Sequence, residues 1–188
     1  MIDGASLPTI DAPRVRLRWL TDGDVDAIFE VFSDRQMMRY WSTPAMQARG
    51  EAEALLERVR EGFDSKSGFQ WGIERKQDGR LLGTCTLFHI DRPNRRAEVG
   101  YGLGSAYWRQ GYMTEALSVL IRFAFETLDL RRLEADVDPR NERSLGILAR
   151  LGFRREGLLR ERWNVGDEIQ DTVFLGLLAS EWRTGPRM

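Results

Sequence analysis

Hydrophobic and polar residues alternate along the chain with two different periods, and each period predicts one kind of element. Short segments alternate at every second position, as in a half-buried strand, and longer segments repeat at three and four positions, as in a helix with one buried face. Strands are predicted at residues 15–19, 69–73, 81–88, 97–103, 133–137, 153–163 and 169–178, and helices at residues 25–32, 48–63, 112–128 and 141–151. This order predicts one mixed α/β domain around a central sheet.

Local signals mark the ends of several predicted elements. Thr21 followed by Asp24 is typical of a capping box before the first helix. Asp78-Gly79 favours a tight hairpin turn, and Gly152 lies where a helix end requires a left-handed residue. The domain is expected to cover residues 14–180, between a flexible lead-in at residues 1–13 and a C-terminal tail at residues 181–188.

Composition excludes several classes of protein. The 188 residues are 42% hydrophobic, which suits one folded domain. The formal net charge of −1 does not fit a surface that coats nucleic acid. No apolar run approaches the ~20 residues of a membrane-spanning helix, and residues 1–13 lack the blocks of a signal peptide. We therefore expect a cytoplasmic protein that acts on neither nucleic acid nor membranes.

The chain has one cysteine, Cys85, and one histidine, His89. A disulfide within the chain is therefore excluded, and a Cys/His zinc site lacks ligands, so no metal is expected. A triad hydrolase would depend on His89 alone, and no Gly-x-Ser-x-Gly turn occurs. We expect Cys85 to be a small core residue and His89 to lie at the surface end of a strand.

A strand, a turn and a helix are predicted from Glu98 to Ala116, with Gly111 at the start of the helix. The first amides of a helix lack internal partners and bind phosphate well, although many such turns only cap a helix. Tyr112 follows Gly111 where a Walker A loop has Lys, and the third glycine of a dinucleotide-binding fingerprint is missing. Nucleoside triphosphates and NAD are therefore disfavoured as ligands.

Three motifs follow one another in this part of the chain. They comprise a Glu-x-Gly-Tyr-x-Leu strand, an aromatic-Trp-x-x-Gly-Tyr-x-Thr-Glu-Ala turn and helix, and an Asn-x-x-Ser pair with Leu-Gly-Phe. The residues that carry them are Glu98–Leu103, Tyr107–Ala116, Asn141–Ser144 and Leu151–Phe153. In this combination the chain resembles the GNAT superfamily of N-acetyltransferases and, within it, the RimJ/RimL-like branch, over residues 14–178.

The resemblance implies a fold and a cosubstrate. The GNAT fold is a central, mostly antiparallel mixed sheet of about seven strands, splayed in the middle and flanked by about four helices. The cosubstrate is acetyl-CoA, and the residues implied to bind it are Tyr101, Gly102, Leu103, Trp108, Arg109, Gln110, Gly111, Tyr112, Met113, Thr114, Asn141 and Ser144. Met113 departs from the family loop, which ends on Gly or Ala. Backbone amides hold the pyrophosphate, so Met113 can serve if its side chain turns into the core, and its helical register with Leu117 predicts that it does.

The mechanism implied by the resemblance is direct attack of an amine on the thioester. Ser144 would protonate the leaving thiolate, and Asn141 would bind the pantetheine arm. From the residue pattern alone, Asn141 is an ordinary helix N-cap and Ser144 lies in the first turn. Glu98 is the first candidate base, with Glu134 and Glu161 as competitors. An α-amine, with a pKa of about 7.7–8.0, also reacts without a dedicated base.

The implied reaction is acetyl transfer to a primary amine, and its acceptor is open. The first candidate is a protein N-terminal α-amine, as on a ribosomal protein. The second is a small amine, a polyamine or an antibiotic, which would favour an acid-lined pocket. The third is a CoA-binding module without catalysis. Tyr40, Trp41 and Trp163 are the candidate acceptor pocket. Since many relatives pair, a homodimer is a further option.

Overall fold

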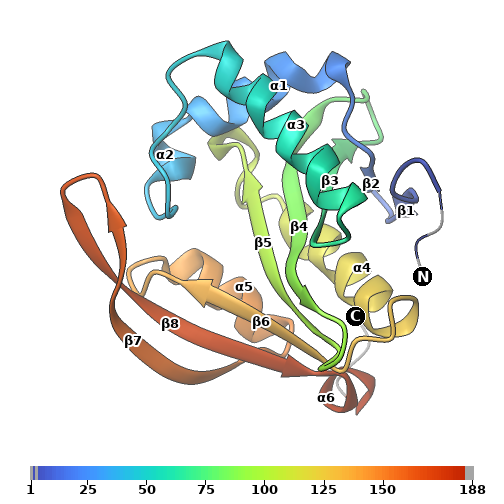
Figure 1. Cartoon of the computed structure of the whole chain (residues 1–188), viewed down its shortest axis with the longest axis vertical. Helices are drawn as coiled ribbons and strands as arrows, with labels where there is room; N and C mark the ends of the chain where they lie inside the picture. The colour runs from blue at the N-terminus through green and yellow to red at the C-terminus, as the bar shows by residue number, and fades with distance from the viewer. Residues whose placement is uncertain (1, 3, 185–188) are drawn as a thin grey trace.

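An eight-stranded sheet runs through the domain in the computed structural model, which describes residue 2 and residues 4–184 (Figure 1). Its order is β1-β2-β3-β4-β5-β6-β8-β7, and only β5 and β6 are parallel neighbours. The strands are β1 (Ile10–Asp11), β2 (Val15–Arg18), β3 (Gly68–Arg75), β4 (Leu81–Asp91), β5 (Arg96–Leu103), β6 (Arg132–Val137), β7 (Arg154–Val165) and β8 (Glu168–Leu178). The mostly antiparallel mixed sheet predicted from the family resemblance is confirmed, with the short β1 as an additional strand.

Six α-helices pack against this sheet within the described residues. They are α1 (Val25–Ser33), α2 (Arg35–Met38), α3 (Arg49–Asp64), α4 (Tyr112–Glu126), α5 (Glu142–Arg150) and α6 (Ala179–Thr184). The four predicted helices correspond to α1, α3, α4 and α5, whereas the short α2 and α6 carry too few residues to show a period. In this part of the chain, no helix combines the length and apolar character that crossing a membrane requires.

The sheet opens at a seam between its two parallel strands. β5 and β6 pair only through residues 96–98 and 132–134, at the start of each strand. Figure 1 shows the two strands leaving this point near α6 and diverging. The splayed sheet that the resemblance implies is therefore present. The last residues of β5 and β6 face an opening instead of each other.

Two apolar clusters hold the elements around the seam. The larger one packs α4 and α5 on the sheet, and it includes Trp71, Leu117 and Leu120, none of which is exposed. The smaller one packs α1 and α3 together, with Ile28 and Leu56 at its centre. Burying one large apolar side chain stabilises the fold by ~1.5–3 kcal/mol. The helical stripes seen in the sequence thus anchor the walls of the opening.

The N-terminal segment differs from the flexible lead-in predicted at residues 1–13. Leu7 and Ala12 are buried, and Ile10–Asp11 pairs with β2 as strand β1. The indole N–H of Trp71 donates to the carbonyl oxygen of Pro8 at 2.9 Å. A strand of two residues is too short to produce a recognisable alternation, so the sequence pattern missed it. At the other end, residues 179–184 form α6, and residues 185–188 of the predicted tail lie outside the described residues.

A buried ion pair fixes the entry to α1. Asp24, which is 6% exposed, accepts hydrogen bonds from Arg18 at 2.7 and 2.8 Å and from the Thr21 backbone N–H at 2.8 Å. Glu74 of β3 binds the other side of Arg18 at 2.5 Å. Burial alone would raise the pKa of Asp24, but the hydrogen bonds from Arg18 and Thr21 outweigh it and lower this pKa. The capping box predicted at Thr21 is confirmed.

Candidate active site

Two cavities flank the seam and meet at it. The larger one, the large cleft, measures about 720 Å³ and lies between the end of β5, the start of α4 and α5. The other, the small cavity, measures about 360 Å³ and lies between β4, β5, β6, β8 and the loop after α2. The residues common to both linings are Tyr40, Trp41, Tyr101, Asn141 and Ser144. A ligand in the cleft therefore comes into reach of a ligand in the cavity.

One end of the large cleft is the N-terminus of α4. Gly111 is the N-cap of this helix with a φ of 83°, in the left-handed region that favours glycine. A Cβ on Gly111 would lie 3.0 Å from Nη2 of Arg14. Residues from Gly111 to Thr114 line the cleft. Since the first N–H groups of a helix have no internal partner and lie at the positive end of its dipole, this end suits a phosphate group.

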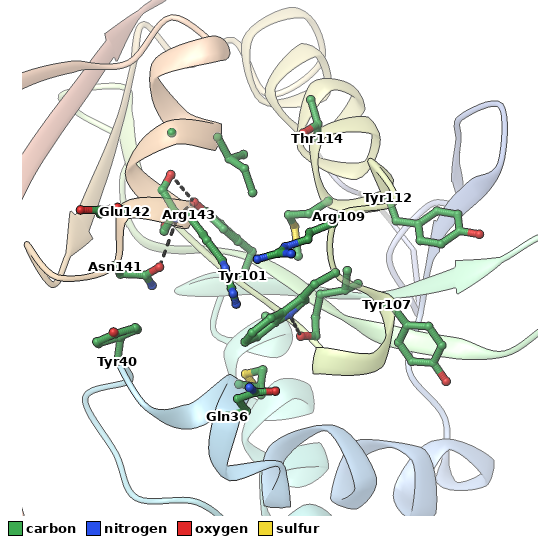
Figure 2. Close-up of a pocket in the computed structure, with 18 of the residues that line it drawn as sticks. Gln36, Tyr40, Tyr101, Tyr107, Arg109, Tyr112, Thr114, Asn141, Glu142 and Arg143 are labelled. Carbon is green, nitrogen blue, oxygen red and sulfur yellow. Dashed lines mark hydrogen bonds between the residues drawn. The ribbon is translucent and has the colours of Figure 1, made fainter.

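Arginines dominate the charge of the large cleft. Its described lining contains Arg39, Arg109, Arg140, Arg143 and Arg150, against the single carboxylate of Glu142. The guanidinium of Arg143 stacks on the ring of Trp108 at 4.5 Å, and the Trp108 indole N–H donates to the Leu103 carbonyl oxygen at 2.7 Å. Figure 2 shows Arg109 and Arg143 pointing into the space between α4 and α5. The cleft is complementary to a polyanion.

A free strand edge forms the floor of the same cleft. Beyond Glu98, the edge of β5 that faces β6 has no ladder partner among the described residues. Tyr101, Gly102 and Leu103 belong to this stretch and line the cleft. Unpaired backbone N–H and C=O groups bind an extended chain as a further strand would. This edge can therefore hold an extended ligand that carries amide groups.

Tyr101 and Ser144 meet in the wall shared by the two cavities. The Oη of Tyr101 lies 2.6 Å from Oγ of Ser144 (Figure 2). Asn141 is the N-cap of α5, as the residue pattern indicated, and its Oδ1 accepts the Ser144 N–H at 3.1 Å. Burial raises the pKa of Tyr101, so its phenol stays protonated at neutral pH. The two hydroxyls form a proton-donating pair where the ligands of both cavities would meet.

Trp41 separates the two cavities next to this pair. A Cβ on Gly102 would lie 2.8 Å from Cζ2 of Trp41 and 3.2 Å from Sδ of Met37, so glycine lets the indole lie directly on β5. The Trp41 ring also meets Phe32 edge-on, with ring centroids 5.3 Å apart. The loop after α2 is thereby held against the strand edge.

Carboxylates dominate the charge of the small cavity. Its described lining contains Glu98, Asp136, Asp138 and Asp171, against the single guanidinium of Arg162. His89 also lines it, and its Nδ1 lies 2.9 Å from Oε1 of Glu98. The charge is opposite to that of the large cleft. A cationic ligand fits this cavity.

Glu134 and Asp136 of β6, and Asp138 directly after this strand, alternate with core residues and lie toward one face of the sheet. Two of them are neutralised by arginine. Glu134 lies between Arg96 and Arg132 at 2.8 and 2.7 Å, and Asp138 binds Arg140 at 2.5 Å. Hydrogen bonds from Arg140 outweigh the burial of Asp138 and lower its pKa. Both residues are therefore committed to structural ion pairs.

Asp136, between them on the same face, is paired weakly. Its Oδ2 lies 3.7 Å from Nε of Arg162, and its Oδ1 is buried with no hydrogen-bond partner in the described part of the chain. Burial raises the pKa of Asp136 and the charge of Glu98 raises it further, whereas Arg162 lowers it. Asp136 is thus a carboxylate with an unmet acceptor atom in the wall of the small cavity.

Two irregular backbone positions shape the rim of the small cavity. His89 has a φ of 48° at a bulge in β4, and Glu161 has a φ of 53° at a bulge in β7. The Glu161 N–H donates to Oδ1 of Asp171 at 2.8 Å, which ties this bulge to β8. Arg162 and Trp163 follow the bulge and line the cavity. Bulges commonly redirect side chains in this way.

Most of the residues predicted to bind the cosubstrate line the large cleft. They are Tyr101, Gly102, Leu103, Trp108, Arg109, Gly111, Tyr112, Met113, Thr114, Asn141 and Ser144. Gln110 is outside this lining, and its side-chain amide donates to the Ala106 carbonyl oxygen. Figure 2 shows the side chain of Tyr112 pointing away from the cleft. The guanidinium carbon of Arg14 lies 5.0 Å from the centroid of the Tyr112 ring. Met113 is buried in the core, as expected.

The residues predicted for the acceptor side also come together. Tyr40, Trp41 and Trp163 line the small cavity with Glu98. The two competitors of Glu98 as a base do not line it, because arginines enclose Glu134 and Glu161 lies exposed on the bulge.

Two features of the site were missed in the sequence. Tyr101 was expected to contribute only its backbone groups, so the role of its phenol was missed. Asp136 was not named as a candidate. A signal for Asp136 existed, because it is an acid in the middle of a predicted strand of the central sheet, where buried acids are rare.

The chain is similar to known acetyltransferases over most of its length. The family described as "Acetyltransferase (GNAT) domain" matches residues 14–154. The uncharacterized N-acetyltransferase YoaA of Bacillus subtilis is 34% identical over 82% of this chain and 87% of its own length. The [ribosomal protein uS5]-alanine N-acetyltransferase of Escherichia coli is 26% identical over 93% of this chain and 96% of its own length. The spermidine N(1)-acetyltransferase of the same organism is 26% identical over 91% of this chain and 89% of its own length.

A solved structure shows the same fold over nearly the whole chain. Mycobacterium smegmatis RimJ in complex with CoA-disulfide superimposes with a TM-score of 0.85 at 26% identity, covering 93% of this chain and 88% of that chain. The motifs at β5, α4 and α5 indicate the same family as the family match, the named relatives and this structure. The chain belongs to the GNAT acetyltransferase family, in its RimJ/RimL-like branch, and is an N-acetyltransferase.

Proposed function

We propose that this N-acetyltransferase transfers the acetyl group of acetyl-CoA, bound in the large cleft, to a cationic primary amine bound in the small cavity. The observation that carries the proposal is the contrast in charge. Arginines line the cleft, carboxylates line the cavity, and the two meet at Tyr101 and Ser144. A polyanionic donor and a cationic acceptor would each be drawn to its own side of the seam.

The residues of the large cleft fit acetyl-CoA, which supplies an activated acyl group as a thioester. The amides from Gly111 to Thr114 would hold the pyrophosphate, because the first N–H groups of α4 have no internal partner and lie at the positive end of the helix dipole. The free edge of β5 from Tyr101 to Leu103 would pair with the amides of the pantetheine arm. Arg143 would bind a phosphate, since its guanidinium already lies across the cleft on Trp108.

Tyr101 and Ser144 would return a proton to the thiolate that leaves. Their hydroxyls are hydrogen-bonded, so Ser144 can donate a proton while Tyr101 donates one to Ser144. The Oδ1 of Asn141 is occupied by the N-cap, which leaves its amide N–H groups as donors for the pantetheine arm.

A small amine with more than one positive charge is the acceptor that the geometry supports best. With Asp138 neutralised by Arg140, the small cavity still offers the carboxylates of Glu98, Asp136 and Asp171 against the guanidinium of Arg162, which is more negative charge than a single ammonium neutralises. Its volume of about 360 Å³ suits a slender chain. Polyamines combine these properties with a free primary amine.

A protein N-terminal α-amine is the second candidate, and a different observation favours it. Leu158, Leu159 and Ile169 are exposed on β7 and β8, on the same hairpin as Trp163 of the small cavity. An extended peptide with an apolar residue after its N-terminus would cover them. The acceptors of the two relatives, uS5 alanine and spermidine, belong to these two classes.

Thiol release from acetyl-CoA tests the proposal with two substrate panels. One panel contains spermidine, spermine and aminoglycosides, and the other contains peptides with free N-terminal Ala, Ser or Met, together with the same peptides blocked at the N-terminus. Turnover of polyamines with unreactive peptides supports the first acceptor class. Turnover of free but not blocked peptides replaces it with the second. Turnover of neither panel, with acetyl-CoA bound, would contradict the proposed function.

A further inference from the structure

The Oδ1 atom of Asp136 is a buried carboxylate oxygen without a hydrogen-bond partner among the described residues. Leaving a buried acceptor unsatisfied costs about 1–3 kcal/mol, and more for a charged group. Neighbouring acids avoid this cost, because Glu134 on β6 and Asp138 directly after it are held by arginines at 2.5–2.8 Å. Something other than folding therefore accounts for a carboxylate at Asp136, and the free oxygen requires a donor.

The position of Asp136 in the cavity points to the donor. It lies on β6 beyond the last pair with β5, Glu98 with Glu134, so the seam opens in front of it. The small cavity that it lines also contains Ser144 and Tyr101, the pair next to the large cleft. An ammonium group between Asp136 and this pair would bring an N–H donor to the carboxylate and lie beside the thioester.

We propose that Asp136 is the residue that binds the acceptor ammonium and removes its proton before attack. Asp136 takes this role instead of Glu98, whose Oε1 already lies 2.9 Å from Nδ1 of His89. The role of Asp136 rests on the proposed function, because it requires an amine in the small cavity.

The protons and electrons of the step balance. The ammonium R–NH3⁺ gives one proton to the carboxylate of Asp136, and the freed lone pair forms the C–N bond with the carbonyl carbon of the thioester. The C–S bond breaks, and its electron pair leaves on the sulfur of CoA. The sulfur takes a proton from the Tyr101–Ser144 pair, and the second nitrogen proton, released as the amide forms, passes to this pair and restores both hydroxyls. Asp136 then releases its proton to solvent.

The charges around Asp136 suit this task. Glu98 on β5 and Glu134 on β6 raise the pKa of Asp136 together with burial, and Arg162 on β7 limits the rise. Asp171 on β8 and His89 on β4 line the same cavity. A base works best when its pKa approaches the working pH, so a raised pKa makes Asp136 a better proton acceptor than an ordinary aspartate.

The test measures kcat and KM against pH for the unsubstituted protein, Asp136→Asn and Glu98→Gln, with whichever panel amine reacts. For Asp136→Asn we expect kcat to fall about 100-fold or more and the acidic limb of the profile to disappear, with the KM for acetyl-CoA unchanged. In Glu98→Gln the acidic limb should move to lower pH, since a charge that raises the pKa of Asp136 is removed. Asp129→Asn changes a surface residue outside both cavities and serves as the control. It should change neither kcat nor the acidic limb of the pH profile.

Folding of the variant is measured separately. Because Asn carries no buried charge, Asp136→Asn should unfold at a temperature equal to or higher than the unsubstituted protein at pH 8. Loss of turnover in a variant of full stability supports the proposal. Loss of turnover in Glu98→Gln, with Asp136→Asn active and its acidic limb retained, overturns it.

Calorimetry with spermine in the presence of CoA separates this role from the proposed function. If no amine in either panel is turned over, the proposed function fails, and binding alone decides the role of Asp136. Spermine binding to the unsubstituted protein but at least tenfold weaker binding to Asp136→Asn supports the role. Equal binding to both proteins, or binding to neither, contradicts it.

Discussion

Tyr101 and Ser144 are 43 positions apart in the chain, yet their hydroxyl oxygens lie 2.6 Å apart across the seam of the sheet. Tyr101 comes from the free part of β5, and Ser144 comes from the first turn of α5, which Asn141 caps. Since β5 and β6 pair only at residues 96–98 and 132–134, their separation creates the gap that these hydroxyls close. The opening in the sheet and the proton-donating pair thus have one structural origin.

Ser144→Ala should lower kcat about 100-fold with little change in the KM for acetyl-CoA, because the leaving thiolate loses its proton donor. Tyr101→Phe should have a smaller effect, since Ser144 keeps its hydroxyl. The double variant should be no slower than Ser144→Ala, because the two residues act as a unit. Steady-state kinetics check this, with Ser118→Ala as a control whose hydroxyl bonds only within α4. Additive losses in the double variant would mean two independent roles.

Gly111→Ala should weaken both the fold and the binding of acetyl-CoA. A positive φ costs a non-glycine residue ~1–2 kcal/mol, and the new Cβ would lie 3.0 Å from Arg14 at the phosphate end of the cleft. The matched control is Gly79→Ala, which has a φ of 72° and no atom within 4 Å of the new Cβ. Both variants should lose a few degrees in Tm, and only Gly111→Ala should raise the KM for acetyl-CoA. A raised KM in both would remove the phosphate role of this turn.

Arg143→Ala should raise the KM for acetyl-CoA about tenfold, because a hydrogen bond to a charged group contributes ~1.5–3 kcal/mol. The KM for S-acetyl-pantetheine, which lacks the terminal phosphates, should not change. Arg122→Ala removes an exposed guanidinium from α4 outside the cleft and serves as the control. If both acyl donors lose affinity equally, Arg143 acts through its stacking on Trp108 and not through a phosphate.

Asp24→Asn should destabilise the protein by about 3 kcal/mol at pH 7, because it leaves Arg18 largely buried without its main partner. The pKa of Asp24 is lowered in the folded protein, so its contribution is present above the unfolded pKa of about 3.9 and is lost as the pH falls. Urea unfolding of both proteins from pH 7 to pH 3 measures this. The difference between them should shrink below about pH 4, and a constant difference would exclude the ion pair as its cause.

The hydrophobic pattern within single helices and strands made part of the fold predictable from the sequence. The helical stripe from Met113 to Ala124 and the alternation of Phe69, Trp71 and Ile73 in β3 follow from period alone, since each records which face of one element meets the core. Met113 was correctly placed in the core because Leu117 lies one helical turn away on the same face. Strand β1, with two residues, shows no period and was missed.

The chemistry of the site depends on contacts between distant elements. The motifs at β5, α4 and α5 led from the sequence to the family and to most residues of the large cleft. Tyr101 meets Ser144 because β5 and β6 separate in front of α5. Gln110 lies outside the lining of the cleft because its side-chain amide binds the Ala106 carbonyl oxygen in the turn before α4.

The acids around the small cavity show most clearly what the sequence determines and what only the tertiary structure decides. The sequence alone determined that acids occur at Glu134, Asp136 and Asp138, at every second position in and directly after a predicted strand. Only the tertiary structure decided that arginines neutralise the first and the last, while the middle one keeps an unpaired oxygen in a cavity. Partners for a charge come from other strands and helices, and their distance is set by packing of the whole sheet, which no local period encodes.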